Sequence, residues 1–543
     1  MSDVLGGTML VLAQQGEFAR LDLPQDALWL LRAALLVYLL VLFGVSIIAT
    51  QRVQTEEDYL VAGRKLPLFL AWGTLIATWF GAATMAGTAQ AAREQGLLGV
   101  ILDPFACSAT LVFAGLCFAA PMWRLKLLTT ADLFRKVYGP RAEVYLACIQ
   151  VPAYFGWIAA QYTALGQMQA IYFGIDLRLA ILIACVVTLA YTLIGGMWSV
   201  TLTDTLQIVI AFLGLLIMGY SVFNNIGEGS ATLGIEKVIV ETWKREPQHL
   251  SLWPLSWGLG IWIVYLGDWA AGLFGNIPGQ DLQQRIFASK SPRVAVQACV
   301  LAGVLYLTFG LIPVSMGLAS RITDPQEIEG GILPWLAAKY LNKYLAVVFV
   351  ISFTSIVVST ATSAVLAPAT LLGHNLLGRL TLFQSRGLLR ERLCVVLISL
   401  GGLMLAYSGR SIIGLLDITL SLHLVALFIP MAAALYGRPR TAYAAIIPMT
   451  VGAGLYFVRM LVELFVSLYV EHRGLELSWS DYLQQQLPAC ATWVAWYALW
   501  TEEAQGFLGG IVAYILVQWW YRHLPPINEE VRRLAWDRSL DPR

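Results

Sequence analysis

The sequence predicts an all-α polytopic membrane protein that crosses the bilayer about thirteen times. Hydrophobic residues make up 58% of the 543 residues and charged residues only 13%, whereas roughly 25% of an average soluble domain is charged. Mean hydropathy is +0.69. Apolar runs of about 20 residues recur along the chain, and a helix of that length crosses the hydrocarbon core with its backbone hydrogen bonds satisfied internally. Two blocks of such runs each open with a run interrupted by glycines, which predicts a repeated architecture.

The predicted spans are bounded by charged residues or by clusters of glycine and proline. They cover residues 27–50, 68–90, 97–121, 143–172, 177–197, 201–224, 256–278, 294–320, 344–374, 391–408, 411–436, 441–468 and 505–523. An odd number of spans places the two termini on opposite sides of the membrane. If the N-terminus is outside, the inside loops carry about twice as many Lys and Arg residues as the outside loops, so the positive-inside rule predicts an outside N-terminus and an inside C-terminus.

The N-terminal segment does not resemble a cleavable signal peptide. Within residues 1–26 the apolar run from Met9 to Ala13 is short, and no basic segment precedes it. No charge run or low-complexity linker separates a soluble domain from the rest, so we expect one membrane domain over residues 1–543, residing in the plasma (cytoplasmic) membrane.

Two blocks of five spans, residues 68–224 and 256–436, form the predicted centre of this domain. The extra N-terminal span 27–50 precedes them, and two C-terminal spans lie within 441–523. An odd number of spans per block gives the blocks opposite orientations, as in an inverted repeat whose interrupted helices surround a midplane site. The interrupting glycines are Gly73, Gly81 and Gly87 in the first block and Gly258, Gly260, Gly267, Gly272 and Gly275 in the second. Close helix packing also favours glycine, so periodicity alone leaves both explanations open.

The chain carries none of the short motifs of common catalytic sites. No HExxH, P-loop or GxSxG sequence is present, and none of the seven cysteines forms a CxxC pair. We therefore expect neither an enzyme nor a nucleic-acid partner, and the formal net charge of +1 is uninformative.

The stretch "YTLIGGMWSVTLTDTLQ" (Tyr191–Gln207) is the most specific part of the sequence. It resembles the signature of the sodium:solute symporter family, and "DYLVAGRKLP" (Asp58–Pro67) and "QQRIFASKSP" (Gln283–Pro292) extend the similarity over 58–437. Within that family, "ATWFGAATMAGTAQA" (Ala77–Ala91) and "WIAAQYTALG" (Trp157–Gly166) are similar to the choline transporter branch. The resemblance implies a LeuT-type fold and sodium-coupled solute symport.

The resemblance also implies a sodium site. Its positions match Ala77, Phe80, Ile356, Ser359 and Thr360, which would supply three carbonyl and two hydroxyl oxygens. Neutral oxygens suit a hard monovalent cation, which makes Na⁺ the expected coupling ion. Alternatively, hydroxyls in a membrane helix bond back to the carbonyl four residues earlier.

Thr203 and Asp204 match family positions that belong to a second sodium ion or to coupling. A buried carboxylate near a cation path is costly unless it has a role. A structural acid satisfied by loop amides is the alternative.

The solute is expected to be cationic or to bear an amine. Trp79 and Trp157 match aromatic positions of the choline transporter branch, and indole faces attract organic ammonium groups. That branch has a tryptophan where this chain has Gly279 and a tyrosine where it has Cys107, so the resemblance implies an incomplete aromatic cage.

Acidic residues within the predicted spans are further solute-site candidates. Asp103, Asp268 and Asp417 lie in core spans, where a carboxylate is a functional hypothesis by default, and Trp269 adjoins Asp268. Pairing with Arg32, Arg459 or His423, or a place near water at a helix end, is the structural alternative.

Together these features predict a sodium-coupled symporter that works by alternating access in the lipid bilayer. Symport of an amino acid or a carboxylate, or a sensor that binds solute without moving it, are the alternatives. The solute, the stoichiometry, any proton role and the oligomeric state do not follow from the sequence.

Overall fold

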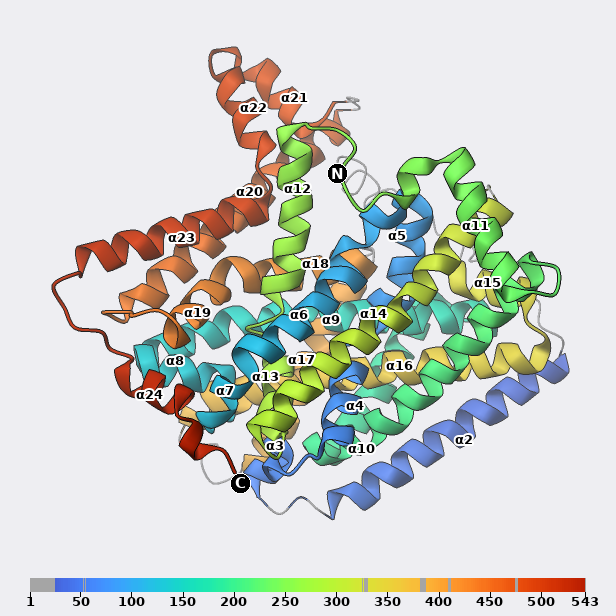
Figure 1. The fold of residues 1–543 in the computed structure, drawn as a ribbon, viewed down its shortest axis with the longest axis horizontal. Helices are drawn as coiled ribbons and strands as arrows, with labels where there is room; N and C mark the ends of the chain where they lie inside the picture. Colours follow the sequence, from blue (N-terminus) through green and yellow to red (C-terminus); the bar gives the residue numbers. More distant parts are fainter. Residues whose placement is uncertain are drawn as a thin grey trace.

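A computed structural model describes residues 25–542, apart from 52, 54, 325, 327–330, 381–386, 409–411 and 474–476. The expectation about a signal peptide in residues 1–26 lies largely outside the described residues. The described chain is a bundle of helices (Figure 1).

The long helices form the body of the bundle, and shorter helices cover its ends. The long ones are α2 (Gln25–Thr50), α9 (Pro140–Phe173), α10 (Leu177–Ile226), α14 (Pro292–Thr323), α16 (Lys343–Thr370), α17 (Gly387–Ala406), α18 (Ile412–His423), α20 (Tyr443–His472) and α23 (Glu502–Trp520). The short ones include α3 (Glu56–Val61), α6 (Cys107–Phe113), α7 (Ala120–Arg124), α8 (Thr130–Tyr138), α11 (Ala231–Arg245), α15 (Ile332–Tyr340), α19 (Ile429–Leu435) and α24 (Glu529–Trp536).

Each predicted span coincides with helical residues. Within the described ranges, eight helical stretches are long and apolar enough to cross a membrane by length and composition. Helices α9, α17 and α23 are not among those eight, and the first helices of both predicted blocks are short because they are interrupted. The total of about thirteen crossings therefore stays a prediction.

The first helix of the first block is broken near its middle. Helix α4 (Leu68–Trp79) ends where Phe80 adopts φ −73° and ψ 83°, which is not helical. A short π-helical turn (Ala83–Gly87) and α5 (Thr88–Gln95) then continue the path. The carbonyl groups before such a break lose their usual partners four residues on, so they are available to other groups.

The first helix of the second block is broken in the corresponding place. Helix α12 (Leu259–Ala270) runs into a π-helical turn (Ala271–Gly275), and the chain turns before α13 (Gln280–Ala288). Matching interruptions in two blocks are the arrangement that the glycine pattern predicts.

The signature stretch forms a sharp bend within α10. Gly196 has φ 55° and ψ −163°, a conformation that residues with a side chain rarely adopt. A Cβ atom at Gly196 would lie 2.4 Å from the Tyr59 ring, so the glycine also allows close packing of α3. Gly196 of this motif is therefore needed for backbone geometry and packing.

The two other motif stretches contact each other directly. Leu66 donates its backbone N–H to the Ala288 carbonyl (3.1 Å) and accepts a hydrogen bond from the Lys290 N–H (3.0 Å). This short parallel bridge joins the segment before α4 to the segment after α13. The approaches to the two broken helices are thereby held together.

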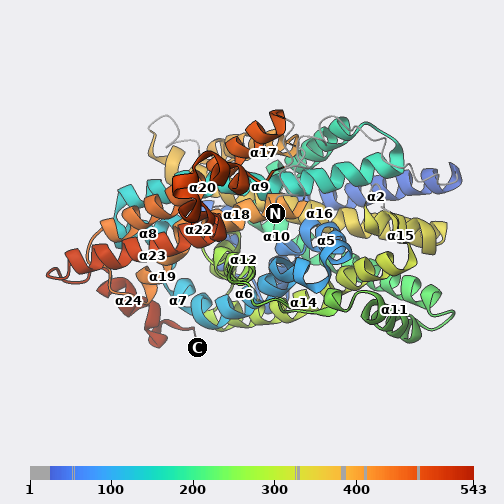
Figure 2. The ribbon, with the colours of Figure 1, turned by 90° about the horizontal axis from the view of Figure 1, so that it is seen from above.

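One part of each broken helix, α4 and α13, lies within the bundle, whereas α12 projects beside α21 and α22. In Figure 1, α4 and α13 lie among α6, α14 and α10, while α2 follows one margin. Viewed from above, α23 and α24 lie at the opposite end of the molecule from α2, α11 and α15 (Figure 2).

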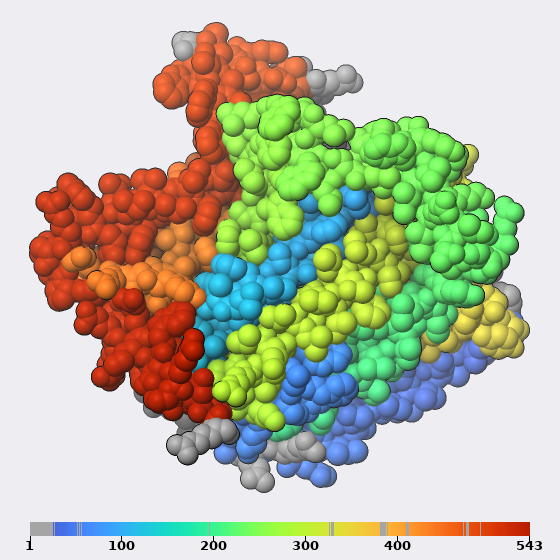
Figure 3. Space-filling view, viewed as in Figure 1, coloured from blue at the N-terminus to red at the C-terminus, as the bar shows by residue number. Residues whose placement is uncertain are grey.

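The C-terminal region adds a projection and a tether. Helices α21 (Trp479–Gln486) and α22 (Ala491–Leu499) extend beyond the rest of the bundle beside α12 (Figures 1 and 3). At the other end, Arg124 donates to Asp541 Oδ1 (2.7 Å) and to the Ala535 carbonyl (3.0 Å), which fastens α24 to α7.

Candidate functional site

A small cavity of about 20 Å³ lies beside the break after α4. Its lining combines aromatic, acidic and polar side chains from both broken helices, from residues 103–107 at the start of α6, and from α9, α14 and α18. The lining residues are Trp79, Gly81, Ala83, Asp103, Cys107, Tyr154, Trp157, Gln161, Asn276, Gly279, Asp281, Tyr306, Leu416, Thr419, Leu420 and His423. Aromatic side chains with a few convergent polar groups are typical of a site for a small molecule.

Oxygen atoms from the break and from α16 converge beside this cavity. The Thr360 hydroxyl oxygen lies 3.1 Å from the Ala77 carbonyl oxygen, 3.3 Å from that of Phe80 and 3.1 Å from that of Ile356. All four residues are fully buried. A hydroxyl group has only one hydrogen to donate, so it cannot satisfy three carbonyl oxygens at once. The cluster is therefore rich in acceptors and suited to a small cation.

Gly81 and Gln161 hold the break in place. A Cβ atom at Gly81 would lie 2.6 Å from Thr360 Cγ2 and 2.8 Å from Gln161 Oε1, so only glycine allows this approach. Gln161 Oε1 accepts a hydrogen bond from the Ala82 N–H (2.9 Å). The helix after the break is thus tied to α9.

Asp204 lies behind the oxygen cluster, between α4 and α16. Its carboxylate accepts hydrogen bonds from Thr74 Oγ1 (2.6 Å) and from Ser359 Oγ (2.5 Å). In this arrangement the Ser359 hydroxyl bonds to Asp204, whereas the Thr360 hydroxyl faces the carbonyl groups. Thr203 instead bonds to the Ser199 carbonyl (2.9 Å), so its hydroxyl does not join Asp204.

Aromatic rings and a histidine form one wall of the cavity. The rings of Tyr154 and Trp157 have centroids 5.9 Å apart, and those of Tyr154 and His423 are 5.3 Å apart. His423 is 2% exposed, and its Nε2 atom has no hydrogen-bond partner among the described residues.

Asp281 fixes the orientation of two of the aromatic side chains. Its carboxylate accepts a hydrogen bond from Trp79 Nε1 (2.5 Å) and another from the Tyr154 hydroxyl (2.5 Å). Asp281 is 5% exposed. The indole of Trp79 is therefore held by a carboxylate that comes from the second broken helix.

Asp103 forms a second acidic point on the cavity lining. Its carboxylate accepts hydrogen bonds from Thr84 Oγ1 (2.8 Å) and from the Tyr306 hydroxyl (3.0 and 3.1 Å). The Tyr306 oxygen also lies 3.2 Å from the Trp79 carbonyl oxygen, which connects Asp103 to the break.

The structure brings together five of the eight predicted solute-site residues. Trp79, Trp157, Asp103, Cys107 and Gly279 all line the cavity.

The other three predicted solute-site residues, Asp268, Trp269 and Asp417, do not line the cavity. Asp417 lies on α18, whose cavity-facing residues include Leu416 and Leu420, and it accepts a hydrogen bond from Ser421 instead (3.2 Å). The helical period turns these side chains to another face, and the sequence did not show that difference.

Arg459, one of the alternative partners of these acids, forms its ion pair with a different residue. Arg459 Nη1 lies 2.8 Å from Glu463 Oε2, and its guanidinium group lies over the Trp479 ring, 4.1 Å from its centroid. Ser421 instead links Asp417 to Glu503, whose Oε1 lies 3.2 Å from Ser421 Oγ.

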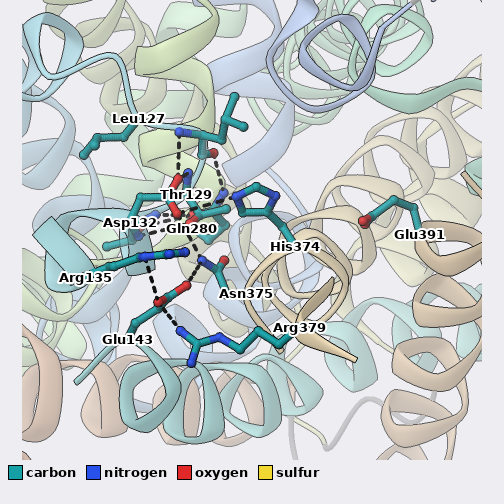
Figure 4. A network of polar contacts seen from close by, with 12 residues as sticks. Leu127, Thr129, Asp132, Arg135, Glu143, Gln280, His374, Asn375, Arg379 and Glu391 are labelled. Atoms are coloured by element: carbon teal, nitrogen blue, oxygen red, sulfur yellow. Dashed lines mark hydrogen bonds and ion pairs between the residues drawn. The ribbon is translucent and has the colours of Figure 1, made fainter. Parts of the chain in front are cut away.

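A network of polar contacts joins α8, α9, α13 and the segment that follows α16 (Figure 4). Asn375 Nδ2 donates to Asp132 Oδ1 (3.1 Å) and to Glu143 Oε1 (2.8 Å). Arg379 donates to the other Glu143 oxygen. The network thus joins α8 and α9 to the segment that follows α16 (Figure 4).

A glutamine extends this network to α13. Gln280 Oε1 accepts hydrogen bonds from the Thr130 N–H (2.8 Å) and hydroxyl (3.0 Å). Gln280 directly follows Gly279 of the cavity lining. The network is therefore linked to the cavity lining through the start of α13.

Sequence reasoning missed six polar lining residues: Tyr154, Gln161, Asn276, Asp281, Tyr306 and Thr419. Asp281 lies two positions before the recognised stretch beginning at Gln283, so its place next to a motif was an available signal. Tyr154 lies one helical turn before Trp157, and the pairing follows from helix geometry. Tyr306 had no local signal, because its role depends on how α14 packs.

These observations define an integral membrane transporter with a site at the breaks of two helices, rather than an enzyme. A profile of the sodium:solute symporter family matches residues 59–407. The chain therefore belongs to the sodium:solute symporter family, and sodium is its coupling ion.

Relatives and solved structures agree with this placement. The chain is 26% identical to high-affinity choline transporter 1 of Caenorhabditis elegans over 432 residues, covering 73% of this chain and 70% of that protein. It is 26% identical to the human high affinity choline transporter 1 over 371 residues, covering 63% and 61%. The human alignment therefore spans less than two thirds of that relative.

A sodium-coupled sialic acid symporter has a similar structure, with a TM-score of 0.64, 17% identity and coverage of 91% and 98%. A nucleobase-cation-symport-1 family transporter gives a TM-score of 0.53 at 12% identity, covering 89% and 99%. These similarities confirm the LeuT-type fold.

Proposed function

We propose that the chain couples sodium entry to the symport of a small solute that carries a positively charged amine. The observation that carries this proposal is the position of Trp79, which lies within the break that exposes the Ala77 and Phe80 carbonyl groups and also lines the cavity. One backbone segment would therefore contact both the ion and the solute.

The proposed sodium site consists of the carbonyl oxygens of Ala77, Phe80 and Ile356 with the hydroxyls of Ser359 and Thr360. Their chemistry supports Na⁺, because neutral oxygens can replace its hydration shell. Asp204 would add a negative charge one hydroxyl away, through Ser359. We also propose that Asp204 binds a second cation or takes part in coupling. Thr203 is left out of this proposal, because its hydroxyl bonds to the Ser199 carbonyl.

The charge balance of the site supports a cationic solute. Asp103, Asp204 and Asp281 are buried carboxylates, and Arg285 is the one buried guanidinium group that contacts this set among the described residues. A sodium ion and one monovalent ammonium would offset the remaining formal charge of the ionised groups. An anionic carboxylate solute would instead add to the uncompensated negative charge, which is costly in a buried site.

Alternating access follows from a site shared by two broken helices. Sodium binding would stabilise one geometry of the break, and the solute would bind that geometry better. Such coupling requires each ligand to bind one conformation more tightly than the other. We assign residues 68–224 and 256–436 to the two inverted repeats that carry this movement.

We also propose an orientation for the chain in the membrane. The distribution of Lys and Arg between loops supports an outside N-terminus and an inside C-terminus in the plasma membrane. The network around Asp132 and Glu143 would then close the inside end of the bundle.

A thermal-shift experiment on purified protein tests the solute class. Amines, amino acids and small carboxylates are compared in sodium and in potassium buffers. We expect amines to raise the unfolding temperature, and to do so more strongly in sodium. Stabilisation by carboxylates alone would contradict the proposal, and binding without sodium-driven uptake would identify a sensor.

A further inference from the structure

We propose that Asp281 binds the ammonium group of the solute and that the site selects ammonium groups that still carry an N–H. This inference rests on the proposed function, because it assumes that the cavity admits a cationic amine. It names the class more narrowly, as primary to tertiary amines in preference to quaternary ammonium ions.

The Asp281 carboxylate retains hydrogen-bonding capacity toward the cavity. Trp79 and Tyr154 each donate one hydrogen bond to it, one to each carboxylate oxygen. An ionised carboxylate has about four acceptor sites, so each oxygen can accept a further donor. The two donors are uncharged, so these hydrogen bonds do not neutralise the carboxylate.

The neighbouring guanidinium group does not occupy this capacity. Arg285 donates to the backbone carbonyl of Asp281 (3.1 Å) and to Ser363 Oγ (2.6 Å). Arg285 thus supports the backbone of α13 from behind, while the carboxylate of Asp281 points to Trp79 and Tyr154.

Gly279 provides the room for this carboxylate. A Cβ atom at Gly279 would lie 2.6 Å from Asp281 Oδ1 and 2.9 Å from the Asn276 carbonyl oxygen. The acid therefore fills the space that a side chain at position 279 would take. The absence of a side chain at Gly279 and the carboxylate of Asp281 therefore depend on each other, and the carboxylate lines the cavity where a larger side chain at position 279 would otherwise lie.

An N–H on the ligand decides between the two classes of cation. A protonated amine can donate a charge-assisted hydrogen bond to Asp281, whereas a quaternary ammonium ion cannot. The quaternary ion keeps only its Coulomb and cation–π attraction to Trp79 and Trp157, and it leaves buried acceptor sites unused. His423 Nε2, which lacks a partner among the described residues, can bond to a second polar group of the solute such as a hydroxyl.

The test uses four compounds that differ only in the methylation of nitrogen: ethanolamine, N-methylethanolamine, N,N-dimethylethanolamine and choline. Binding to the purified full-length protein is measured by thermal shift over a concentration series in sodium buffer. We expect wild-type protein to bind the first three roughly tenfold or more tightly than choline, the range of one charge-assisted hydrogen bond. In Asp281→Asn this preference should disappear.

Two further variants separate a specific effect from a loss of folding. Gly279→Ala should also remove the preference, because its methyl group displaces the Asp281 carboxylate. Asp417→Asn is the matched control, since it removes a carboxylate outside the cavity, and it should leave the ranking of the four compounds unchanged. If Asp281→Asn does not fold, the ranking of the four compounds by the wild-type protein and by Gly279→Ala still tests the role of Asp281.

The outcomes distinguish this inference from the proposed function. Sodium-dependent binding of all four compounds with no preference for N–H, or with a ranking unchanged in Asp281→Asn and Gly279→Ala, overturns the role of Asp281 and leaves the proposed function intact. Failure of every compound in the series and of other amines to bind in sodium overturns both.

Discussion

Thr360 is a fully buried residue of α16 whose hydroxyl belongs to the proposed sodium site. Its hydroxyl oxygen lies within 3.3 Å of three carbonyl oxygens, two of them at the break after α4. The sequence could predict this grouping because Ala77, Phe80 and Ile356 occupy positions of a recognisable pattern. It could not show that the Ser359 hydroxyl bonds to Asp204, because that contact depends on how α10 packs against α16.

Thr360→Ala should weaken sodium binding by about tenfold or more, because it removes an oxygen ligand from the cluster. The measurement is the sodium concentration that gives half-maximal thermal stabilisation. Thr370→Ala is a suitable control on the same helix, since the Thr370 hydroxyl bonds back to the Leu366 carbonyl (2.9 Å). Equal sodium dependence in both variants would count against the proposed ligand set.

Gly81→Ala tests the same cluster from the opposite side. The added methyl group would lie 2.6 Å from Thr360 Cγ2, so the break must widen or Thr360 must move. We expect weaker sodium stabilisation with the fold retained. Gly454→Ala is the control, because no atom outside its own helix lies within 4 Å of the added methyl group.

At the scale of elements, the broken helices and the middle of α16 decide what the site can do. The glycine pattern predicted both interruptions, and the structure has them after Trp79 and after Gly275. The sequence could not show that Asp268 and Asp417 lie away from the cavity, because a residue's position along a span does not determine which neighbouring helix its side chain faces.

Asn375→Asp should destabilise the network that follows α16. The new carboxylate would face Asp132 and Glu143, and buried like charges repel one another. We expect the unfolding temperature to fall by roughly 4 °C or more. Asn342→Asp, at the other end of α16, should have little effect, because aspartate caps a helix N-terminus about as well as asparagine.

The tether of α24 should depend on pH. The Arg124 guanidinium group holds the pKa of the Asp541 carboxyl below its usual range. Because the folded pKa is lowered, the stabilisation is present above the ordinary value of about 4 and is lost as pH falls below it. Limited proteolysis of the tail should therefore increase in acid for wild type, and Arg124→Met should show that increase already at neutral pH.

At the scale of the whole molecule, family, fold and membrane character were accessible from the sequence. The motif at Tyr191–Gln207 identified the family, and the family match over residues 59–407 confirmed it. The composition of the cavity was only partly accessible, since Asp281, Tyr154 and His423 come from three helices far apart in the chain. Their proximity arises from packing around the breaks.

An epitope placed after Arg543 should be reached by antibody only in permeabilised cells, because the positive-inside rule places this end inside. An epitope at the N-terminus should be reached in intact cells. Staining of both ends from one side would contradict the odd number of spans.

The central claim is that a sodium gradient drives the accumulation of a cationic amine. Ethanolamine and choline uptake into proteoliposomes, with an inward sodium gradient or an equal potassium gradient, tests it most directly. We predict accumulation of at least one of the two above equilibrium with sodium and none with potassium, and a loss of sodium dependence in Thr360→Ala. Equal uptake under both gradients would contradict the account.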